Sequence, residues 1–396
     1  MLINQKSKQQ PINYAKKDNL VVLHIITSLS TGGAQLMLYH LLNKSNRDKI
    51  TPVVVSLMDR GNLCGRIEEL DIPIYTLDMN LGMLNLGAIS KLKNVVNQVK
   101  PDIIQGWMYH GNLAAQVAKF LTQNRSSTIW GIHHSINMLS SEKITTQLII
   151  KLSSFLSRFV DKIAFVSKNS QRQHHSLGYT SKNSCTIPNG FNTCLFKPSD
   201  NLKLKLRKDL GLPPNSILIG SIARYHPMKD HANFVRSAAI LTKDFPDVHF
   251  VMVGTDINKE NHQLYQLIQD LGLEQHIHLM GEREDIPDII PGLDILASSS
   301  AYGEAFPLIL GEAMSSGVPC AVTDVGDSAW IVGNTGKIVE PGSSKKLANA
   351  WKELIVLGPE DRKKLGIMAR KRIIEHFSLD SVVAKYEDLY EKVLAN

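Results

Sequence analysis

Short apolar runs rich in β-branched residues alternate with segments of helical period along most of this sequence, and this alternation limits the folds open to it. The first run, residues 20–28, is followed by a glycine turn and by a helical pattern over residues 34–42. Further strand candidates lie at residues 52–57, 103–105, 128–133 and 162–166. Such alternation is typical of a parallel sheet with helices on both faces.

The same rhythm begins again after a stretch rich in Pro, Asn and Gly at residues 187–198, which we interpret as an interdomain linker. A helix is expected at residues 231–241, and strands are expected at residues 217–222, 249–253, 277–280, 295–297 and 319–322. The prediction is an α/β protein of two doubly wound, Rossmann-like domains. Such sheets bind ligands beyond the carboxyl ends of their strands, so we expect any reaction that the protein catalyses to take place in a central cleft between the two domains.

The expected domain boundaries follow from this pattern. Residues 1–18 are polar and unpatterned, and we expect a mobile basic tail there. Residues 19–196 would form the first domain and residues 197–377 the second. Residues 378–396 open with a serine cap at Ser378 and carry apolar residues at helical spacing, which predicts a terminal helix.

Charge is distributed unevenly between the two halves. Residues 1–199 hold 22 Lys+Arg and 10 Asp+Glu, a net charge of +12, whereas residues 200–396 hold 22 and 27, a net charge of −5. A basic half suggests an anionic partner such as nucleic acid or a lipid surface, although a solvated basic face would give the same count. The sequence contains no run of about 18 apolar residues and no signal-peptide pattern, so we expect a cytoplasmic protein.

A short, sharply bounded helix is predicted from Pro307. Proline suits the first helical position, Gly317 would end the helix, and Pro319 would prevent its continuation. The first backbone N–H groups of a helix have no partner within it, so those of Leu308 and Ile309 would be available to bind phosphate oxygens.

Four charged side chains are placed near the ends of predicted strands in the second domain. Arg224 follows the strand at residues 217–222, and Lys229 stands five residues later, where a diphosphate would bind. Glu304 precedes the short helix and Glu312 lies in its second turn. On spacing alone, the two carboxylates could be a loop acid and an exposed helix acid.

Together these segments resemble the retaining glycosyltransferases of GT-B fold known as family 4, which include bacterial lipopolysaccharide and capsule sugar transferases. The resemblance covers nearly the whole chain. It rests on the glycine loop at residues 31–35, the linker pattern at residues 188–196, the Arg-x4-Lys pair and the Glu-x7-Glu signature. It also implies that the terminal helix, residues 378–396, crosses back to the first domain.

The resemblance assigns roles to matching residues of the second domain. Arg224 and Lys229 would neutralise the donor diphosphate, Glu312 would bind the ribose, Glu304 would contact the transferred sugar, and Arg283 would lie beside the nucleobase. Departure of a nucleoside diphosphate builds negative charge, which fixed cations and a helix N-terminus stabilise in the transition state. No metal or other cofactor is therefore expected, and the sequence has no Asp-x-Asp motif.

Further donor and acceptor residues follow from the same resemblance. Gly32 and Gly33 would let backbone donors approach the donor closely, and Phe306 belongs to the donor loop. His133 matches the acceptor-side histidine and is a candidate catalytic residue, and His110 is a second candidate on the acceptor side. A histidine at a strand end can also be a purely structural hydrogen-bonding residue.

The expected substrates are a nucleotide-sugar, most simply a UDP-sugar, and a polyprenyl- or lipid-linked saccharide, with no nucleic-acid partner. Residues 144–163 predict a basic amphipathic helix, with Lys151, Arg158 and Lys162 beside apolar residues at positions 144, 148, 152, 155, 159 and 163. Such a helix suits peripheral docking on the anionic inner face of the cytoplasmic membrane. The alternative is an ordinary helix packed on the first sheet.

Rival functions remain at this point. A dinucleotide-dependent oxidoreductase would need a G-x-G-x-x-G loop after the first strand, which the sequence lacks. A sugar-nucleotide epimerase of GT-B fold lacks support from the Glu-x7-Glu signature. A non-catalytic sugar-nucleotide-binding protein, or a transferase with a soluble acceptor, is an alternative that turnover of a donor panel would decide.

Overall fold

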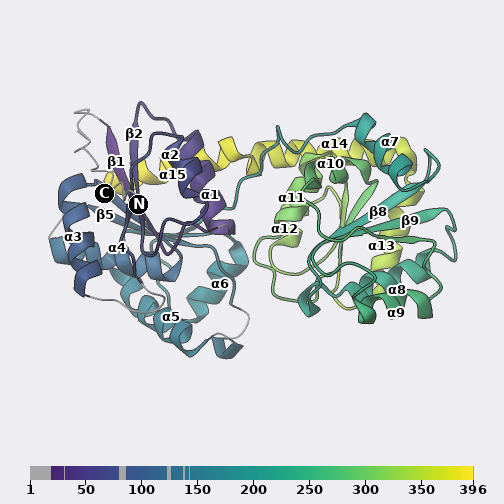
Figure 1. Ribbon diagram of the computed structural model, residues 1–396, viewed down its shortest axis with the longest axis horizontal. Helices are drawn as coiled ribbons and strands as arrows, with labels where there is room; N and C mark the ends of the chain where they lie inside the picture. The colour runs from purple at the N-terminus through teal and green to yellow at the C-terminus, as the bar shows by residue number, and fades with distance from the viewer. Residues whose placement is uncertain are drawn as a thin grey trace, which may run out of the picture. The chain divides into compact units, whose positions relative to one another are not determined.

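The computed structural model describes residues 19–30, 32–79, 86–122, 126–136, 139–141 and 143–395, so the predicted tail at residues 1–18 and Thr31 of the glycine loop lie outside the described residues. Two parallel sheets organise the chain (Figure 1). The chain divides into two compact units. Unit 1 comprises the described residues up to Ile132, Lys143–Ala164 and the residues from Leu389; unit 2 comprises the described parts of 133–142 and Phe165–Asp388.

The first sheet has seven strands in the order β3-β2-β1-β4-β5-β6-β7. Its strands are β1 (Leu20–Ile26), β2 (Ile50–Ser56), β3 (Ile74–Thr76), β4 (Ile103–Trp107), β5 (Ser127–Ile132), β6 (Lys162–Phe165) and β7 (Ser184–Thr186). The helices between them are α1 (Gly33–Lys44), α2 (Cys64–Glu68), α3 (Leu86–Val99), α4 (Met108–Thr122), α5 (Ile144–Leu156) and α6 (Lys168–Ser176). Parallel neighbours require crossover connections, which these helices provide.

The second sheet has six strands in the order β10-β9-β8-β11-β12-β13. Its strands are β8 (Ile217–Ile222), β9 (Val248–Val253), β10 (Ile277–Leu279), β11 (Ile295–Ser298), β12 (Cys320–Thr323) and β13 (Lys337–Val339). The remaining helices are α7 (Asp200–Asp209), α8 (His231–Leu241), α9 (His262–Asp270), α10 (Ile286–Ile289), α11 (Leu308–Ser315), α12 (Ser328–Val332), α13 (Ser344–Val356), α14 (Gly358–Phe377) and α15 (Leu379–Leu394).

Side chains of the second sheet alternate between two cores, one on each face. On β9, Val251 and Val253 pack with α11 and α14, whereas Phe250 and Met252 pack with α8 and α13. Figure 1 shows α8 and α9 together near one face of this sheet and α11 and α12 near the other. Both faces are apolar because both are covered, and this confirms the prediction of doubly wound α/β domains.

The structure adds three strands that the sequence pattern did not indicate, β3, β7 and β13, each of three residues. It also corrects the predicted helix over residues 144–163. Helix α5 ends at Leu156, a 3-10 turn follows at Ser157–Phe159, and Lys162 begins strand β6. Lys162 therefore does not belong to the basic helical face, and Ile163 is buried in the sheet.

The end of helix α15 contacts the first sheet. Ser378 caps it through a hydrogen bond from the backbone N–H of Ser381, 3.1 Å long. Its last residues, from Leu389, belong to unit 1, where the buried Tyr390 hydroxyl donates to Oε1 of Gln105 on β4. Among the helices of the described ranges, none combines the length and the apolar character needed to cross a bilayer.

Candidate active site

The carboxyl ends of three neighbouring strands bring the predicted charged residues of unit 2 together. Strands β8, β11 and β12 are adjacent in the sheet, so the loops that follow them meet at one edge. The backbone N–H of Ala301 donates to the carbonyl of Met228 at 2.8 Å, and the Ser299 hydroxyl donates to the carbonyl of Lys229 at 2.8 Å. These bonds join the loop after β8 to the loop after β11.

Two glycines that sequence reasoning missed allow the loops to approach one another. Gly254, after β9, has φ +148°, and a Cβ there would lie 2.2 Å from the carbonyl oxygen of Ala223. Gly326, after β12, has φ +63°, and a Cβ there would lie 2.2 Å from the carbonyl oxygen of Glu304. Because no side chain fits at either position, both are required to be glycine. The available signal was a glycine close behind a buried strand, directly after β9 for Gly254 and three residues after β12 for Gly326.

Lys229 and Glu304 form an ion pair across these loops. The Glu304 carboxylate, in a residue only 7% exposed, also accepts a hydrogen bond from the Ser300 hydroxyl at 2.7 Å, and the Thr323 hydroxyl donates to the Ser300 carbonyl at 2.6 Å. The lysine is thus held in a fixed position at the sheet edge. Sequence reasoning predicted Lys229 and Glu304 in this site but neither their pairing nor the contribution of Ser300 and Thr323.

Arg224 and Arg283 lie in the loops after β8 and β10. Arg224 is exposed and, within the described residues, has no ion-pair partner. Arg283 is held by Asp285, with 2.7 Å between its Nε and the carboxylate Oδ1. Arg224 is therefore available to an anionic ligand, whereas Arg283 already has a carboxylate partner.

Helix α11 is as short and sharply bounded as predicted, although Pro307 is its N-cap and not its first residue. Leu308 and Ile309 begin the helix, so their N–H groups lack partners within it, and Gly317 adopts φ +73° beyond its end. The Phe306 side chain is buried and stacks on Phe191, with ring centroids 5.9 Å apart. Only the backbone of Phe306 is thus left to contact a ligand.

Glu312 lies on α11 and is partly buried, and this burial raises its pKa from 4.5 to about 7. An acid in an apolar environment retains its proton because the charged form would lose its hydration. Near neutral pH this carboxyl can therefore donate a hydrogen bond as well as accept one. The family role of Glu312, binding of ribose hydroxyls, is compatible with either form.

The remaining predicted residues lie elsewhere. Gly32 is the N-cap of α1 and Gly33 its first residue, and a Cβ on Gly33 would meet nothing within 4 Å, so the space beside it is open. His110 lies on α4 of unit 1 among apolar side chains, and burial lowers its pKa. His133 belongs to unit 2, where burial lowers its pKa to about 4 and a side-chain hydrogen bond with Asn189 acts in the opposite direction. Both histidines are therefore neutral at pH 7.

This edge of the second sheet can hold a doubly charged anion. Arg224 supplies an exposed cation and Lys229 one that is held by Glu304. The start of α11 adds backbone donors and the positive end of the helix dipole. The neighbouring carboxyl groups of Glu304 and Glu312 can accept hydrogen bonds from hydroxyl groups. A ligand with phosphate and hydroxyl groups matches this chemistry.

Comparison with known proteins agrees with this chemistry. The family model described as glycosyl transferases group 1 matches residues 203–372, and the model described as glycosyltransferase family 4 matches residues 31–194. The UDP-Gal:alpha-D-GlcNAc-diphosphoundecaprenol alpha-1,3-galactosyltransferase of Escherichia coli is 31% identical over 53% of this chain, and that alignment spans 54% of the relative, about half its length. The N-acetyl-alpha-D-glucosaminyl L-malate synthase of Bacillus anthracis is 25% identical over 78% of this chain and 80% of the relative.

Solved structures show the same fold. The HepE protein of Anabaena in complex with UDP has a TM-score of 0.80 and 23% identity, covering 94% of this chain and 100% of that structure. A glycosyltransferase from Rickettsia africae has a TM-score of 0.80 and 22% identity, covering 96% and 100%. Both halves of the sequence and both sheets point to one group of proteins. The chain belongs to the family 4, or group 1, glycosyltransferases and has their GT-B fold.

Proposed function

We propose that this protein is a retaining, metal-independent glycosyltransferase that moves a hexose from a UDP-sugar to a lipid-linked saccharide. The acceptor would lie at the inner face of the cytoplasmic membrane, during synthesis of a bacterial surface polysaccharide. The observation that carries the proposal is the charge cluster at the edge of the second sheet, where Arg224 and the Lys229–Glu304 pair lie in the loops after β8 and β11.

The donor class is supported by this cluster and by the relatives. In the proposed reaction an acceptor hydroxyl oxygen bonds to the anomeric carbon and gives up its proton to the leaving diphosphate or to solvent. The bond between that carbon and the diphosphate oxygen breaks, and UDP departs with its electron pair, so negative charge builds on UDP. Arg224, Lys229 and the α11 N-terminus would stabilise that charge, which makes the leaving group better without a metal ion. The named E. coli relative uses UDP-Gal, and the Anabaena structure holds UDP.

The acceptor class is supported by the relatives' names. The E. coli enzyme acts on a diphosphoundecaprenol-linked sugar, and a Rhizobium meliloti relative, 24% identical over 69% of this chain, is a lipopolysaccharide core mannosyltransferase. The B. anthracis relative is named for L-malate, which keeps a soluble acceptor as the second candidate.

A donor and acceptor matrix tests the proposal. The protein is incubated with UDP-, GDP- and ADP-hexoses, each with a polyprenyl-diphosphate-linked sugar or with L-malate, and products are identified by mass spectrometry and by the anomeric NMR signal. We expect transfer from a UDP-sugar to the lipid-linked acceptor with retention. Transfer to malate alone would show that the acceptor is soluble and not lipid-linked. A product of inverted anomeric configuration would exclude a retaining mechanism, and binding of all donors without turnover would favour a non-catalytic protein.

A further inference from the structure

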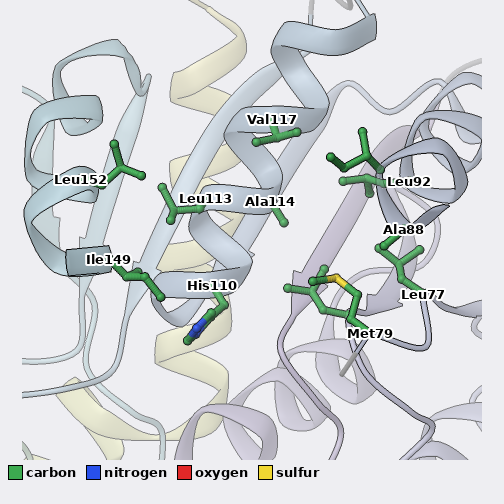
Figure 2. Close-up of a pocket in the computed structure, with 12 residues that line it drawn as sticks. Leu77, Met79, Ala88, Leu92, His110, Leu113, Ala114, Val117, Ile149 and Leu152 are labelled. Carbon is green, nitrogen blue, oxygen red and sulfur yellow. The ribbon is translucent and has the colours of Figure 1, made fainter. Parts of the chain in front are cut away.

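A cavity of about 240 Å³ lies within unit 1, lined almost entirely by apolar side chains. One face of α4 forms its centre, because the residues that line it follow helical spacing: His110, Leu113, Ala114 and Val117. Figure 2 shows the side chains of Ile149 and Leu152 on one side of this helix and those of Leu77, Met79, Ala88 and Leu92 on the other. Among the described residues that line the cavity, His110 is the one whose side chain contains nitrogen.

The cavity adjoins an exposed apolar stripe on α5 and the turn that follows it. Leu152 lines the cavity and is itself 51% exposed. The stripe continues over residues between 51% and 76% exposed, namely Ile144, Leu148, Leu152, Phe155 and Phe159. Five large apolar side chains exposed on one short segment exceed the scattered exposure usual for a protein surface and indicate a binding surface.

Between Lys143 and Phe159 the charged residues are of one sign. Lys143, Lys151 and Arg158 are exposed beside it, and the guanidinium of Arg158 lies 5.1 Å from the centre of the Phe155 ring. Helix α5 itself contains no Asp or Glu. An apolar stripe flanked by cations is complementary to an anionic lipid surface, with hydrocarbon against the stripe and phosphates against the cations.

The lining of the cavity favours a hydrocarbon chain as its occupant. A peptide segment would bring backbone N–H and C=O groups that need hydrogen-bond partners, and the lining offers almost none. The volume is also below the roughly 300–1,000 Å³ typical of sites that enclose a complete small molecule. A stretch of aliphatic chain whose polar end stays outside satisfies both limits.

We propose that this cavity binds the isoprenoid chain of the lipid-linked acceptor, drawn from the membrane beside α5. The inference rests on the proposed function for the choice of a polyprenyl lipid over other lipids. The headgroup phosphates would lie near the cations of α5, and the chain next to them would enter between α4 and α5. The cavity would thereby select acceptors by their lipid part.

Binding of a short isoprenoid tests this directly and without the donor. The full-length protein is titrated with farnesyl phosphate and, in parallel, with dodecyl phosphate, below their micelle concentrations, and heat of binding is measured. Leu113→Trp fills the cavity from a partly exposed position, and Phe120→Trp, on the exposed side of the same helix, is the matched control. Val117→Phe is a second filling variant in case the first does not fold.

We expect saturable binding of farnesyl phosphate that weakens at least tenfold in Leu113→Trp or Val117→Phe and is unchanged in Phe120→Trp. Equal affinity for dodecyl phosphate would overturn the isoprenoid assignment. No saturable binding, or equal loss in Phe120→Trp, would overturn the cavity as a lipid site. Donor hydrolysis is assayed separately, so failure of the transferase proposal can be distinguished from failure of the lipid-site proposal.

Discussion

The partly buried carboxyl group of Glu312 makes the stability of the protein depend on pH in a direction that can be worked out. Its pKa is about 7 in the folded protein against 4.5 as an ordinary side chain, so the folded state binds the proton more tightly. The stability that this tighter proton binding contributes is fully present below pH 4.5, declines as the pH rises towards 7, and is lost above 7. At about 1.4 kcal/mol per pKa unit, the whole difference amounts to about 3 kcal/mol.

Replacement of Glu312 by Gln removes this titration while keeping the shape of the side chain. We expect Glu312→Gln to be more stable than wild type by about 1 kcal/mol at pH 5 and by about 3 kcal/mol at pH 8, because only the wild type must bury a charge at high pH. Urea unfolding followed by circular dichroism at each pH measures the gap. Because the two units need not unfold together, only the difference in unfolding free energy between variant and wild type at the same pH is interpreted.

A control variant separates this effect from a general consequence of removing a carboxylate. Glu340 is exposed, and a hydrogen bond from Lys346 lowers its pKa, so Glu340→Gln should not gain stability as the pH rises. A stability gap for Glu312→Gln that is the same at pH 5 and pH 8 would show that Glu312 is ionised in the folded protein, and the reasoning would fail.

Three further predictions concern catalysis and the membrane. Arg224→Ala and Lys229→Ala should each lower turnover about 100-fold or more, and a well-folded variant with normal turnover would exclude that residue from the mechanism. Urea unfolding should show that only Lys229→Ala is also destabilised, since it leaves Glu304 buried without its cation. Transfer measured in excess EDTA should persist, and complete loss restored by added metal would contradict the proposed role of the cations. The protein should float with anionic liposomes at low salt and be released at high salt. Changing Lys143, Lys151 and Arg158 to Glu should prevent flotation while donor hydrolysis continues, and unchanged flotation would mean that α5 does not face lipid.

Sequence patterns predicted the long buried elements best, because these contain enough residues to show a period. Strand β8 and helix α8 have the predicted bounds. Strands β3, β7 and β13 have three residues each and were missed, whereas β10, which is equally short, was predicted from residues 277–280. The helix predicted over residues 144–163 was too long because Phe159 and Ile163 continue the apolar spacing into a 3-10 turn and a strand.

The placement of four charged residues after predicted strands could be read from the sequence, but the partners of these residues could not. Arg224, Lys229, Glu304 and Glu312 follow strands of the second sheet, and position after a strand is visible in the sequence. The Lys229–Glu304 pair joins residues 75 positions apart, and it depends on β8 and β11 being neighbours in the sheet. Strand order is not contained in local patterns, so the pairing required the structure.

The return of α15 to the first sheet has a consequence for biosynthesis. Tyr390 is buried against Gln105, 285 positions earlier in the chain, so unit 1 is complete only after α15 has left the ribosome. Until then the Gln105 side chain and the apolar surface that α15 covers stay accessible, although strands β1 to β5 have long been synthesised. Domains generally fold in order during synthesis. Unit 1, whose strands are the first to be made, is therefore the last of the two units to be completed.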